Sequence, residues 1–196
     1  MSKSPEKMKA VKERLFQAAM ELFEKKGYEN TSVAEITQQA GVSKGTFFTH
    51  FSSKDAVFSA IGGIFTEYMQ GIVDTGLTEN RSAKQILLEC ICMADEWCTT
   101  NKKMILQVLI SGMYQPTLGS HATSNRVVMA EMLLRVLKTG QQNGEISASI
   151  SGEDATSMLV GLFFNVMYDW FHDNGAWSLK DKLSDCLEIL YRGIGS

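Results

Sequence analysis

The sequence predicts an all-α protein of about nine helices, divided into a three-helix N-terminal domain and a larger helical body. Only two of the 196 residues are proline, and 44% are hydrophobic, which is enough for a real buried core. Apolar residues recur at intervals of three and four, the period of an amphipathic helix, and no run alternates as a half-buried strand does. Glycines or polar capping residues separate these periodic segments, as expected at helix ends.

The first helix is expected from about Glu6 to Lys26. A stripe of apolar residues at helical spacing gives it one buried face: Val11, Leu15, Ala18, Ala19, Leu22 and Phe23. Lys25 and Lys26 suit the negative end of the helix dipole, and Gly27 ends the helix.

The next segment predicts two short helices joined by a tight turn. Ser32 and Glu35 fit the capping box S-x-x-E, which satisfies amide groups at a helix start. Gly41 can adopt the left-handed backbone that ends a helix sharply, and Ser43 can cap the helix that follows. This order of elements, over about residues 32–51, is that of a helix-turn-helix, whose second helix enters the major groove of DNA.

The second of these short helices, from about Lys44 to His50, cannot be stable alone. Phe47 and Phe51 lie four residues apart and are the expected anchors that hold it in place. Ser43 and Thr46 could serve only as caps of this helix, without contacting DNA.

A fourth helix is expected from the S-x-x-D start signal at Ser52 to about Asp74. Its early Gly62-Gly63 pair is unusual, because an interior glycine costs on the order of 1 kcal/mol. The pair indicates either close packing against a neighbouring helix or a bend between the two domains. Further helices are expected at about residues 82–99, 101–113 and 121–142, the last after a link at 115–120, and then behind capping signals at Ser151 and Ser178.

The helix behind Ser151 is apolar almost all round from Met158 to Phe171. A helix of this kind is buried on every side. In a body this small, one side would pack within the subunit and the other against a second subunit. Together with the last helix it would form a four-helix interface across a two-fold axis, so a homodimer is expected.

The charge is distributed unevenly along the chain. Residues 1–55 carry nine basic and seven acidic residues, a net charge of +2, whereas the remainder carries −5. The acidic remainder would repel DNA, so only the first part is a plausible phosphate binder.

The cysteines and the apolar segments indicate the compartment. Four cysteines in a chain of this length are not a disulfide framework. At Cys90, Cys92 and Cys98 we expect buried reduced thiols, and the alternative is a metal or redox site. The N-terminus has no apolar core for a signal peptide, and the longest apolar window is shorter than the roughly 20 residues that span a bilayer. We therefore expect a cytoplasmic protein that does not associate with membranes.

One segment resembles the DNA-binding domain of the TetR family of transcriptional regulators: AAMELFEKKGYENTSVAEITQQAGVSKGTFFTHFSSKDAVF. The resemblance covers about residues 10–60. Its landmarks are Ala18-Ala19, Leu22-Phe23, Gly27-Tyr28, Thr31-Ser32-Val33, Ile36, Ala40 to Thr46, His50-Phe51 and Ser53-Lys54-Asp55. In the body only GQQNGEIS, from Gly140 to Ser147, is similar to the family. The helical pattern of the body agrees by analogy with a ligand-binding and dimerisation domain.

The resemblance implies a set of DNA-contacting residues. They are Thr31, Ser32, Ser43, Lys44, Gly45, Thr46, Phe48, His50 and Lys54. Lys44 and Gly45 open the recognition helix, where a side chain and bare backbone can approach base edges. Thr31 and Ser32 lie at the start of the preceding helix, whose amide groups face the DNA backbone.

Three further positions match phosphate contacts of the family: Thr46, His50 and Lys54. Phe48 stands where the family usually has a tyrosine whose hydroxyl reaches a phosphate. Losing that hydrogen bond would weaken binding by roughly 1 kcal/mol, and Phe48 would only pack against sugars.

Methionine and aromatic residues of the body belong first of all to its core, but such side chains also suit a pocket for apolar ligands. The candidates for an effector site are Met93, Asp95, Trp97, Met104, Met113, Phe163, Met167 and Trp170. Asp95 falls in phase with Leu88 and Ile91 on an apolar face. A buried carboxylate there would pair with a lysine or arginine of the protein, or meet a cationic ligand.

The sequence thus predicts a dimeric transcriptional regulator, with a helix-turn-helix DNA-binding domain over about residues 8–55 and a ligand-binding and dimerisation domain over 56–196. Two heads would read the half-sites of a palindromic operator, as two-fold symmetry requires. A small apolar or amphipathic effector that prefers the DNA-free state would release a repressor of this kind. The alternative is a DNA-binding regulator that has no small-molecule response and acts through protein partners.

Enzymatic activity is not expected. The sequence contains no nucleophile–base pair, metal-ligand spacing or phosphate-binding glycine loop. His121 and His172 are too far apart in sequence to suggest a metal site, and Glu35 is expected to be a capping partner. We therefore expect neither a cofactor nor a metal.

Overall fold

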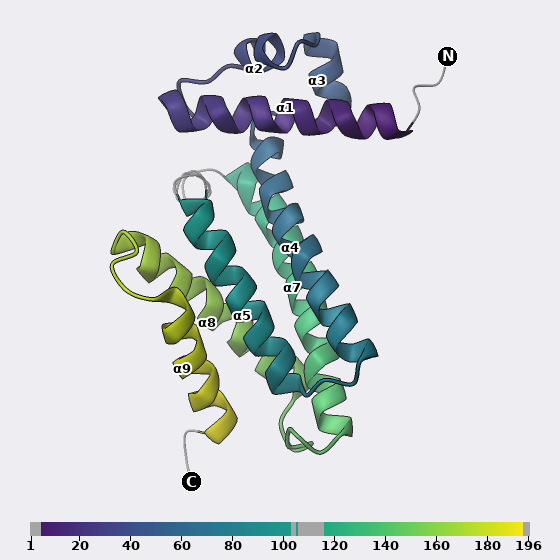
Figure 1. Cartoon of the computed structure of the whole chain (residues 1–196), viewed down its shortest axis with the longest axis vertical. Helices are drawn as coiled ribbons and strands as arrows, with labels where there is room; N and C mark the ends of the chain where they lie inside the picture. Colours follow the sequence, from purple (N-terminus) through teal and green to yellow (C-terminus); the bar gives the residue numbers. More distant parts are fainter. Residues whose placement is uncertain (1–4, 103–104, 106–115, 194–196) are drawn as a thin grey trace. The chain divides into compact units, whose positions relative to one another are not determined.

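The computed structural model describes residues 5–102, 105 and 116–193, without the side chains of residues 5, 6, 58, 59, 61 and 116–124. This described part is all-helical (Figure 1), which confirms the predicted fold class. The helices are α1 (Pro5–Lys26), α2 (Val33–Gln39), α3 (Lys44–His50), α4 (Asp55–Thr78), α5 (Ala83–Thr100), α7 (Pro116–Gln142), α8 (Gly152–His172) and α9 (Leu179–Arg192).

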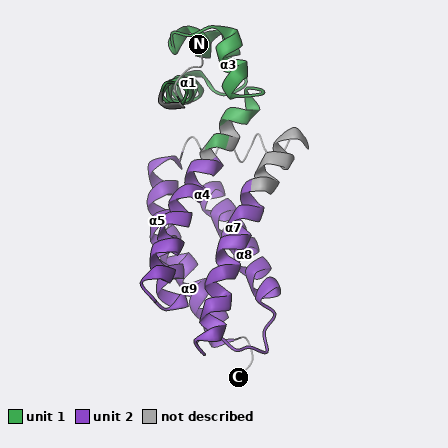
Figure 2. Ribbon diagram, turned by 90° about the vertical axis from the view of Figure 1, so that its right-hand side faces the viewer, with its two compact units in different colours: residues 1–61, 103–121 green, residues 62–102, 122–196 purple. Residues whose placement is uncertain are grey.

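The chain divides into two compact units (Figure 2). One comprises residues 1–61 with 103–121, and the other comprises residues 62–102 with 122–196. Helices α1 to α3 and the first two turns of α4 belong to the first unit. The predicted domain boundary, after residue 55, coincides with the start of α4, and the change of unit falls six residues later.

In the first unit, α2 packs against α1 and α3 packs against α2, and both short helices lie on one side of α1 (Figure 1). Apolar residues of all three helices are buried in this unit. The fully buried side chains there are Leu15, Ala19, Phe23, Ile36 and Phe47. Because α2 and α3 each have only seven residues, this shared interior, and not intrinsic helix stability, holds them in place.

In the second unit, α9 packs against both α5 and α8. Apolar residues at helical spacing on five helices form one continuous core. Its buried members include Met69, Val73, Ile86, Leu87, Met132, Leu133, Val136, Val160 and Leu187. This core fixes the two C-terminal helices against the rest of the unit.

Of the two explanations for Gly62-Gly63, close packing is confirmed for Gly62. A Cβ atom added at Gly62 would lie 3.0 Å from Cγ of Asn125 on α7, closer than side chains normally approach. A Cβ added at Gly63 would have no neighbour within 4 Å, so packing does not explain the second glycine.

Most predicted helix starts are confirmed. Ser32, Ser43, Ser82, Ser151 and Ser178 are all N-caps whose side chains accept an amide hydrogen three residues later. The same short-range rule was wrong at α4, where Ser53 and not Ser52 accepts the amide of Ala56, at 3.2 Å.

Two predicted boundaries were also wrong. The link expected at residues 115–120 begins α7, which starts at Pro116 and not near His121. Proline is favoured at the first position of a helix, because its missing N–H would have no partner there and its fixed φ is already helical. Helix α4 continues to Thr78, beyond the expected end at Asp74. The helix expected over 101–113 falls mostly on residues outside the described part.

Helix α4 is long and apolar enough to cross a membrane by length and composition alone. The core helix of a soluble protein can meet the same criteria, and α4 contributes the buried Met69 and Val73 to the core of the second unit. One such helix is therefore weak evidence for a membrane span.

Candidate functional site

The start of α2 is fixed by the predicted capping box. Ser32 Oγ accepts the amide hydrogen of Glu35 at 3.3 Å, and the Glu35 carboxylate accepts the amide hydrogen of Ser32 at 2.9 Å. The same carboxylate pairs with Lys26 at the end of α1. The hydrogen bond from Lys26, followed by those from Ser32, lowers the pKa of Glu35 from 4.5 to about 2.

Glu35 makes the first unit sensitive to acid. A carboxylate whose folded pKa is depressed contributes stability that is fully present above its unfolded pKa and is lost as pH falls through the folded pKa. For Glu35 that window runs from pH 4.5 down to about 2. We expect Glu35→Gln to lower the melting temperature near neutral pH, and the difference from the wild type to shrink as pH falls through this window.

Thermal melting of both proteins over a pH series measures this effect. Glu13→Gln is the matched control, because Glu13 is exposed on α1, and its melting curve should follow that of the wild type throughout. If the melting temperatures of Glu35→Gln and the wild type differ by the same amount down to about pH 2, the proposed role of the Glu35 carboxylate is contradicted.

The turn between α2 and α3 has the predicted geometry. Gly41 has φ +65°, a left-handed backbone that suits glycine, and the next amide, of Val42, donates to the carbonyl of Thr37 at 2.9 Å. Ser43 Oγ accepts the amide hydrogen of Thr46 at 3.1 Å and lies 2.9 Å from Oγ1 of Thr46. The Ser43 hydroxyl therefore caps α3 and also bonds to the Thr46 hydroxyl.

Two phenylalanines anchor α3 as predicted. Phe47 has no exposed surface and Phe51 is 3% exposed, and their ring centroids lie 5.6 Å apart. The opposite side of α3 faces solvent: Lys44, Gly45 and Phe48 are exposed, and Thr46 and His50 are half-buried. The exposed fraction of Phe48 is 56%, large for an apolar ring of this size.

One exposed residue on this surface was not among the candidates. Thr49 follows Phe48, and its hydroxyl donates to the carbonyl of Gly45 at 3.0 Å. The spacing of four residues from Gly45 could have identified it, because residues i and i+4 share a helix face.

Thr31 and Lys54 differ from the exposed candidates on α3, because Thr31 is buried and the Lys54 ammonium group is bound to two backbone carbonyls. Thr31 is 2% exposed, and its hydroxyl donates to the carbonyl of Gly27 at 2.8 Å. Lys54 Nζ donates to the carbonyls of Tyr28 at 2.7 Å and Thr31 at 2.9 Å.

The second unit contains a small apolar cavity of about 50 Å³. Its lining is entirely apolar apart from one thiol: Met69, Leu87, Cys90, Ile91, Ala94, Met129, Leu133, Leu159, Leu162, Phe163, Leu183 and Leu187. Among the predicted effector residues that the structure describes, only Phe163 is part of this lining. The aliphatic residues were missed because an apolar helix pattern does not distinguish a cavity wall from a packed core.

The other described candidates from the body lie elsewhere. Met93 packs against the core of the unit, and Trp97 contacts the rings of Phe65 and Tyr68 at centroid distances of 6.3 and 5.7 Å. Met167 and Trp170 are buried, and Trp170 Nε1 donates to the carbonyl of Trp177 at 2.8 Å. Met104 and Met113 lie outside the described residues.

Asp95 has a partner that its sequence context did not reveal. Its carboxylate accepts the amide hydrogen of Lys180, in the first turn of α9, at 3.1 Å. A carboxylate at the positive end of a helix dipole is stabilised there, so Asp95 ties α5 to α9. The residue is half-buried and is not part of the cavity lining.

The cysteines differ from the expectation at one position. Cys90 and Cys98 are buried, and burial raises the pKa of each thiol to about 12, so both stay protonated. Cys92 is exposed, and the prediction of a buried thiol there was wrong. On α5 it falls between the inward-facing positions 90 and 94.

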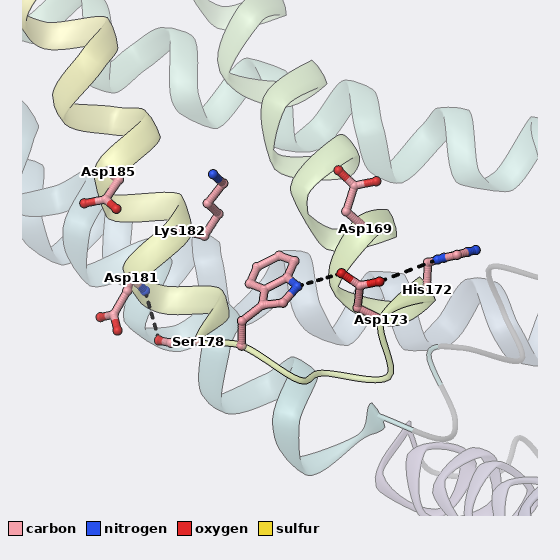
Figure 3. A pocket seen from close by; sticks show the side chains of 8 residues that line it. Asp169, His172, Asp173, Ser178, Asp181, Lys182 and Asp185 are labelled. Carbon is pink, nitrogen blue, oxygen red and sulfur yellow. Dashed lines mark hydrogen bonds and ion pairs between the residues drawn. The ribbon is translucent and has the colours of Figure 1, made fainter.

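A larger hollow of about 580 Å³ lies on the surface beside α8 and α9 (Figure 3). It contains four aspartates, including Asp173, which accepts the indole hydrogen of Trp177 at 3.0 Å. Within the described ranges, no group of three acidic, histidine or cysteine side chains is placed to hold a metal ion.

The helix-turn-helix region has a recognisable sequence profile. Residues 15–61 match the family described as "Bacterial regulatory proteins, tetR family". These residues include α2, the glycine turn, α3 and the first turns of α4. Residues 15–61 are therefore a DNA-binding domain of the TetR family. This makes the chain a DNA-binding transcriptional regulator, and that family consists of regulators rather than enzymes.

Proteins similar to the whole chain agree with the TetR assignment. The HTH-type transcriptional regulator UidR of Escherichia coli K12 is 25% identical over 166 residues, which cover 80% of this chain and 79% of UidR. The crystal structure of Thermus thermophilus FadR, a TetR family repressor in complex with lauroyl-CoA, superposes with a TM-score of 0.79 at 24% identity, covering 94% of this chain and 95% of that one. Bacillus subtilis FadR in complex with stearoyl-CoA gives 0.74 at 24% identity, covering 93% and 98%. Both structures show that the TetR fold extends over the body.

Proposed function

We propose that this regulator is a cytoplasmic, dimeric repressor, released from a palindromic operator by an amphipathic ligand with a hydrocarbon chain. Residues 8–55 would bind DNA, and residues 56–196 would bind the ligand and form the dimer. The observation that carries the proposal is the pairing of a solvent-facing recognition helix in one unit with an apolar cavity in the other.

The exposed side of α3 supports the DNA contacts. Lys44 and Gly45 are exposed at the start of the helix. A lysine there can bind guanine, and a glycine allows the protein backbone to approach the DNA closely. Thr46, in the first turn of α3, and His50, at its end, would bind phosphates. Phe48 would add only apolar contact, since it has no hydroxyl to donate.

The outward side of α8 supports the dimer. Met158 is 61% exposed, Tyr168 is 43% exposed, and a Cβ added at Gly161 between them would meet nothing within 4 Å. On the adjacent α9, Ile189 is 55% exposed. A second copy packed on these two helices would cover the four residues in a four-helix interface.

The cavity supports a ligand with a hydrocarbon chain. No charged side chain lines it, and Asp95, the candidate for a cationic ligand, is bonded to Lys180 outside it. Its volume of about 50 Å³ is far below the several hundred Å³ typical of ligand pockets, so a ligand must displace side chains to enter. Met69 and Met129 in the lining are unbranched and adaptable, which suits such a displacement. Two of the similar structures hold lauroyl-CoA and stearoyl-CoA, ligands of this chemical class.

A DNA-binding titration tests the proposal. A duplex is selected from random sequence with the full-length protein, and affinity is measured across a salt series with and without lauroyl-CoA or stearoyl-CoA. We expect affinity to fall steeply with salt, because phosphate contacts release counterions, and to fall by about tenfold or more with acyl-CoA, in the range of allosteric coupling. Free coenzyme A, which lacks the hydrocarbon chain, should have no effect.

The same titration decides against the alternatives. Binding that shows no salt dependence would contradict a DNA-binding role. Salt-dependent binding that no acyl compound changes would favour a regulator that responds to protein partners, for which the small size of the cavity is the supporting observation.

A further inference from the structure

The loop between α1 and α2 is held by a residue from outside it, Lys54. Lys54, directly before α4, places its Nζ atom between two carbonyl oxygens of this loop, at 2.7 Å from Tyr28 O and 2.9 Å from Thr31 O. The same nitrogen lies 3.9 Å from the centroid of the Tyr28 ring, close enough for a cation–π contact. One lysine therefore binds the loop by three separate contacts.

The next residue holds the other end of the same tyrosine. The Tyr28 hydroxyl donates to the carboxylate of Asp55, the first residue of α4. Tyr28 is 6% exposed, and its ring meets that of Phe23 edge-on, with the centroids 5.3 Å apart. We call Tyr28, Thr31, Lys54 and Asp55 the loop clasp.

The clasp holds the loop that leads into α2. Thr31 is followed at once by Ser32, the N-cap of α2, and its amide donates to the carbonyl of Tyr28 at 3.1 Å. Gly27, with φ +82°, ends α1 on the other side of the loop. The whole path from α1 to α2 is thus bonded either to itself or to the start of α4, and α3 follows because it packs against α2.

The ammonium group of Lys54 is poorly available for DNA. It has three N–H donors, and two of them are on carbonyl oxygens. Partial burial removes part of its hydration shell and thereby lowers its pKa. Binding a phosphate would require Lys54 to leave both loop carbonyls without this donor. Lys44, exposed at the start of α3, has no such cost.

We propose that Lys54 is a positioning residue that sets the placement of α2 and α3 through the loop clasp, and that it does not neutralise a phosphate. This revises the contact implied for Lys54 by the family resemblance. The proposal rests on the DNA-binding function proposed above.

Paired lysine variants of the full-length protein test it. Lys54→Met and Lys44→Met both remove a positive charge and keep the unbranched stem. For Lys44→Met we expect the slope of log affinity against log salt to fall by about one for each head, with an unchanged melting temperature. For Lys54→Met we expect the wild-type slope, an operator affinity lowered by about tenfold, and a lower melting temperature, because hydrogen bonds to a charged group are lost within the fold.

A Lys54→Met protein that loses as much slope as Lys44→Met, and melts like the wild type, would overturn the proposal. If Lys54→Met does not fold, Tyr28→Phe tests the loop clasp instead. This variant removes only the hydroxyl bonded to Asp55 and leaves every charge in place. It should lower the melting temperature and the operator affinity at constant slope, and an effect on neither would overturn the clasp. A wild-type protein that does not bind DNA would refute the proposed function. The melting temperatures of Lys54→Met and Tyr28→Phe would still show whether the loop clasp stabilises the fold.

Discussion

Replacing Phe47 by alanine is expected to unfold the first unit and to abolish DNA binding. Phe47 has no exposed surface, and its ring packs against that of Phe51 in the interior shared by α1, α2 and α3. Truncating a buried phenylalanine costs about 3–5 kcal/mol, because the apolar contacts are lost and a cavity remains. That is a large part of the roughly 5–15 kcal/mol that stabilises a whole domain. A seven-residue α3 cannot persist without its anchor.

The neighbouring phenylalanine is the matched control. Phe48→Ala removes the same ring from a position that is 56% exposed, so the melting temperature should hardly change. Circular dichroism melting and DNA-binding measurements on the two variants distinguish a loss of folding from a loss of DNA contact. A Phe47→Ala protein with the wild-type melting curve would show that α3 is held by something other than its buried ring.

Replacing Met158 by glutamate is expected to separate the dimer into monomers that remain folded. Met158 is 61% exposed in a single copy, so a charge there costs the subunit little, but in the proposed interface it would lie opposite apolar residues of α8 and α9. When one DNA-binding domain of a dimer is bound, the other is held at a high effective concentration near its half-site. Loss of the dimer should therefore weaken operator binding by about 100-fold or more.

Light scattering after size-exclusion chromatography measures the mass of the assembly. Comparing the affinities for a full operator and a half operator measures how much the dimer contributes to binding. Val127→Glu on α7 is the matched control, because it also places a charge at an exposed apolar position, 49% exposed, on another helix. Its mass and affinity should equal those of the wild type. A Met158→Glu protein that stays dimeric and binds normally would place the dimer interface elsewhere.

Local features of the fold could be predicted from the sequence because neighbouring residues determine them. Serine caps such as Ser151 and Ser178, the left-handed Gly41 and the anchors Phe47 and Phe51 depend on spacings of three or four residues, which the sequence displays directly. Rules of this kind fail only where two local signals compete. At Pro116, for example, a residue that suggests a link also suits the first position of a helix.

The features that could not be predicted join distant parts of the chain. Asp95 binds an amide 85 residues later, and Lys54 reaches carbonyls 26 and 23 residues earlier. Nothing in the sequence around either residue indicates its partner. Similarly, Met69, Leu133 and Leu183 line one cavity from three helices, and each has the pattern of an ordinary core residue. The DNA-binding surface was therefore more accessible to sequence reasoning than the cavity.

The lining of that cavity has a consequence for how the regulator would behave in a cell. Leu159 and Leu162 come from α8, and Leu183 and Leu187 from α9, the same two helices whose outer sides form the proposed dimer interface. In such a dimer, filling the cavity and pairing the subunits would act on the same helices, and linkage makes any such coupling reciprocal. The number of copies of the protein would then help to set the amount of ligand needed to switch its gene on, so expression level itself would tune the sensitivity of the response.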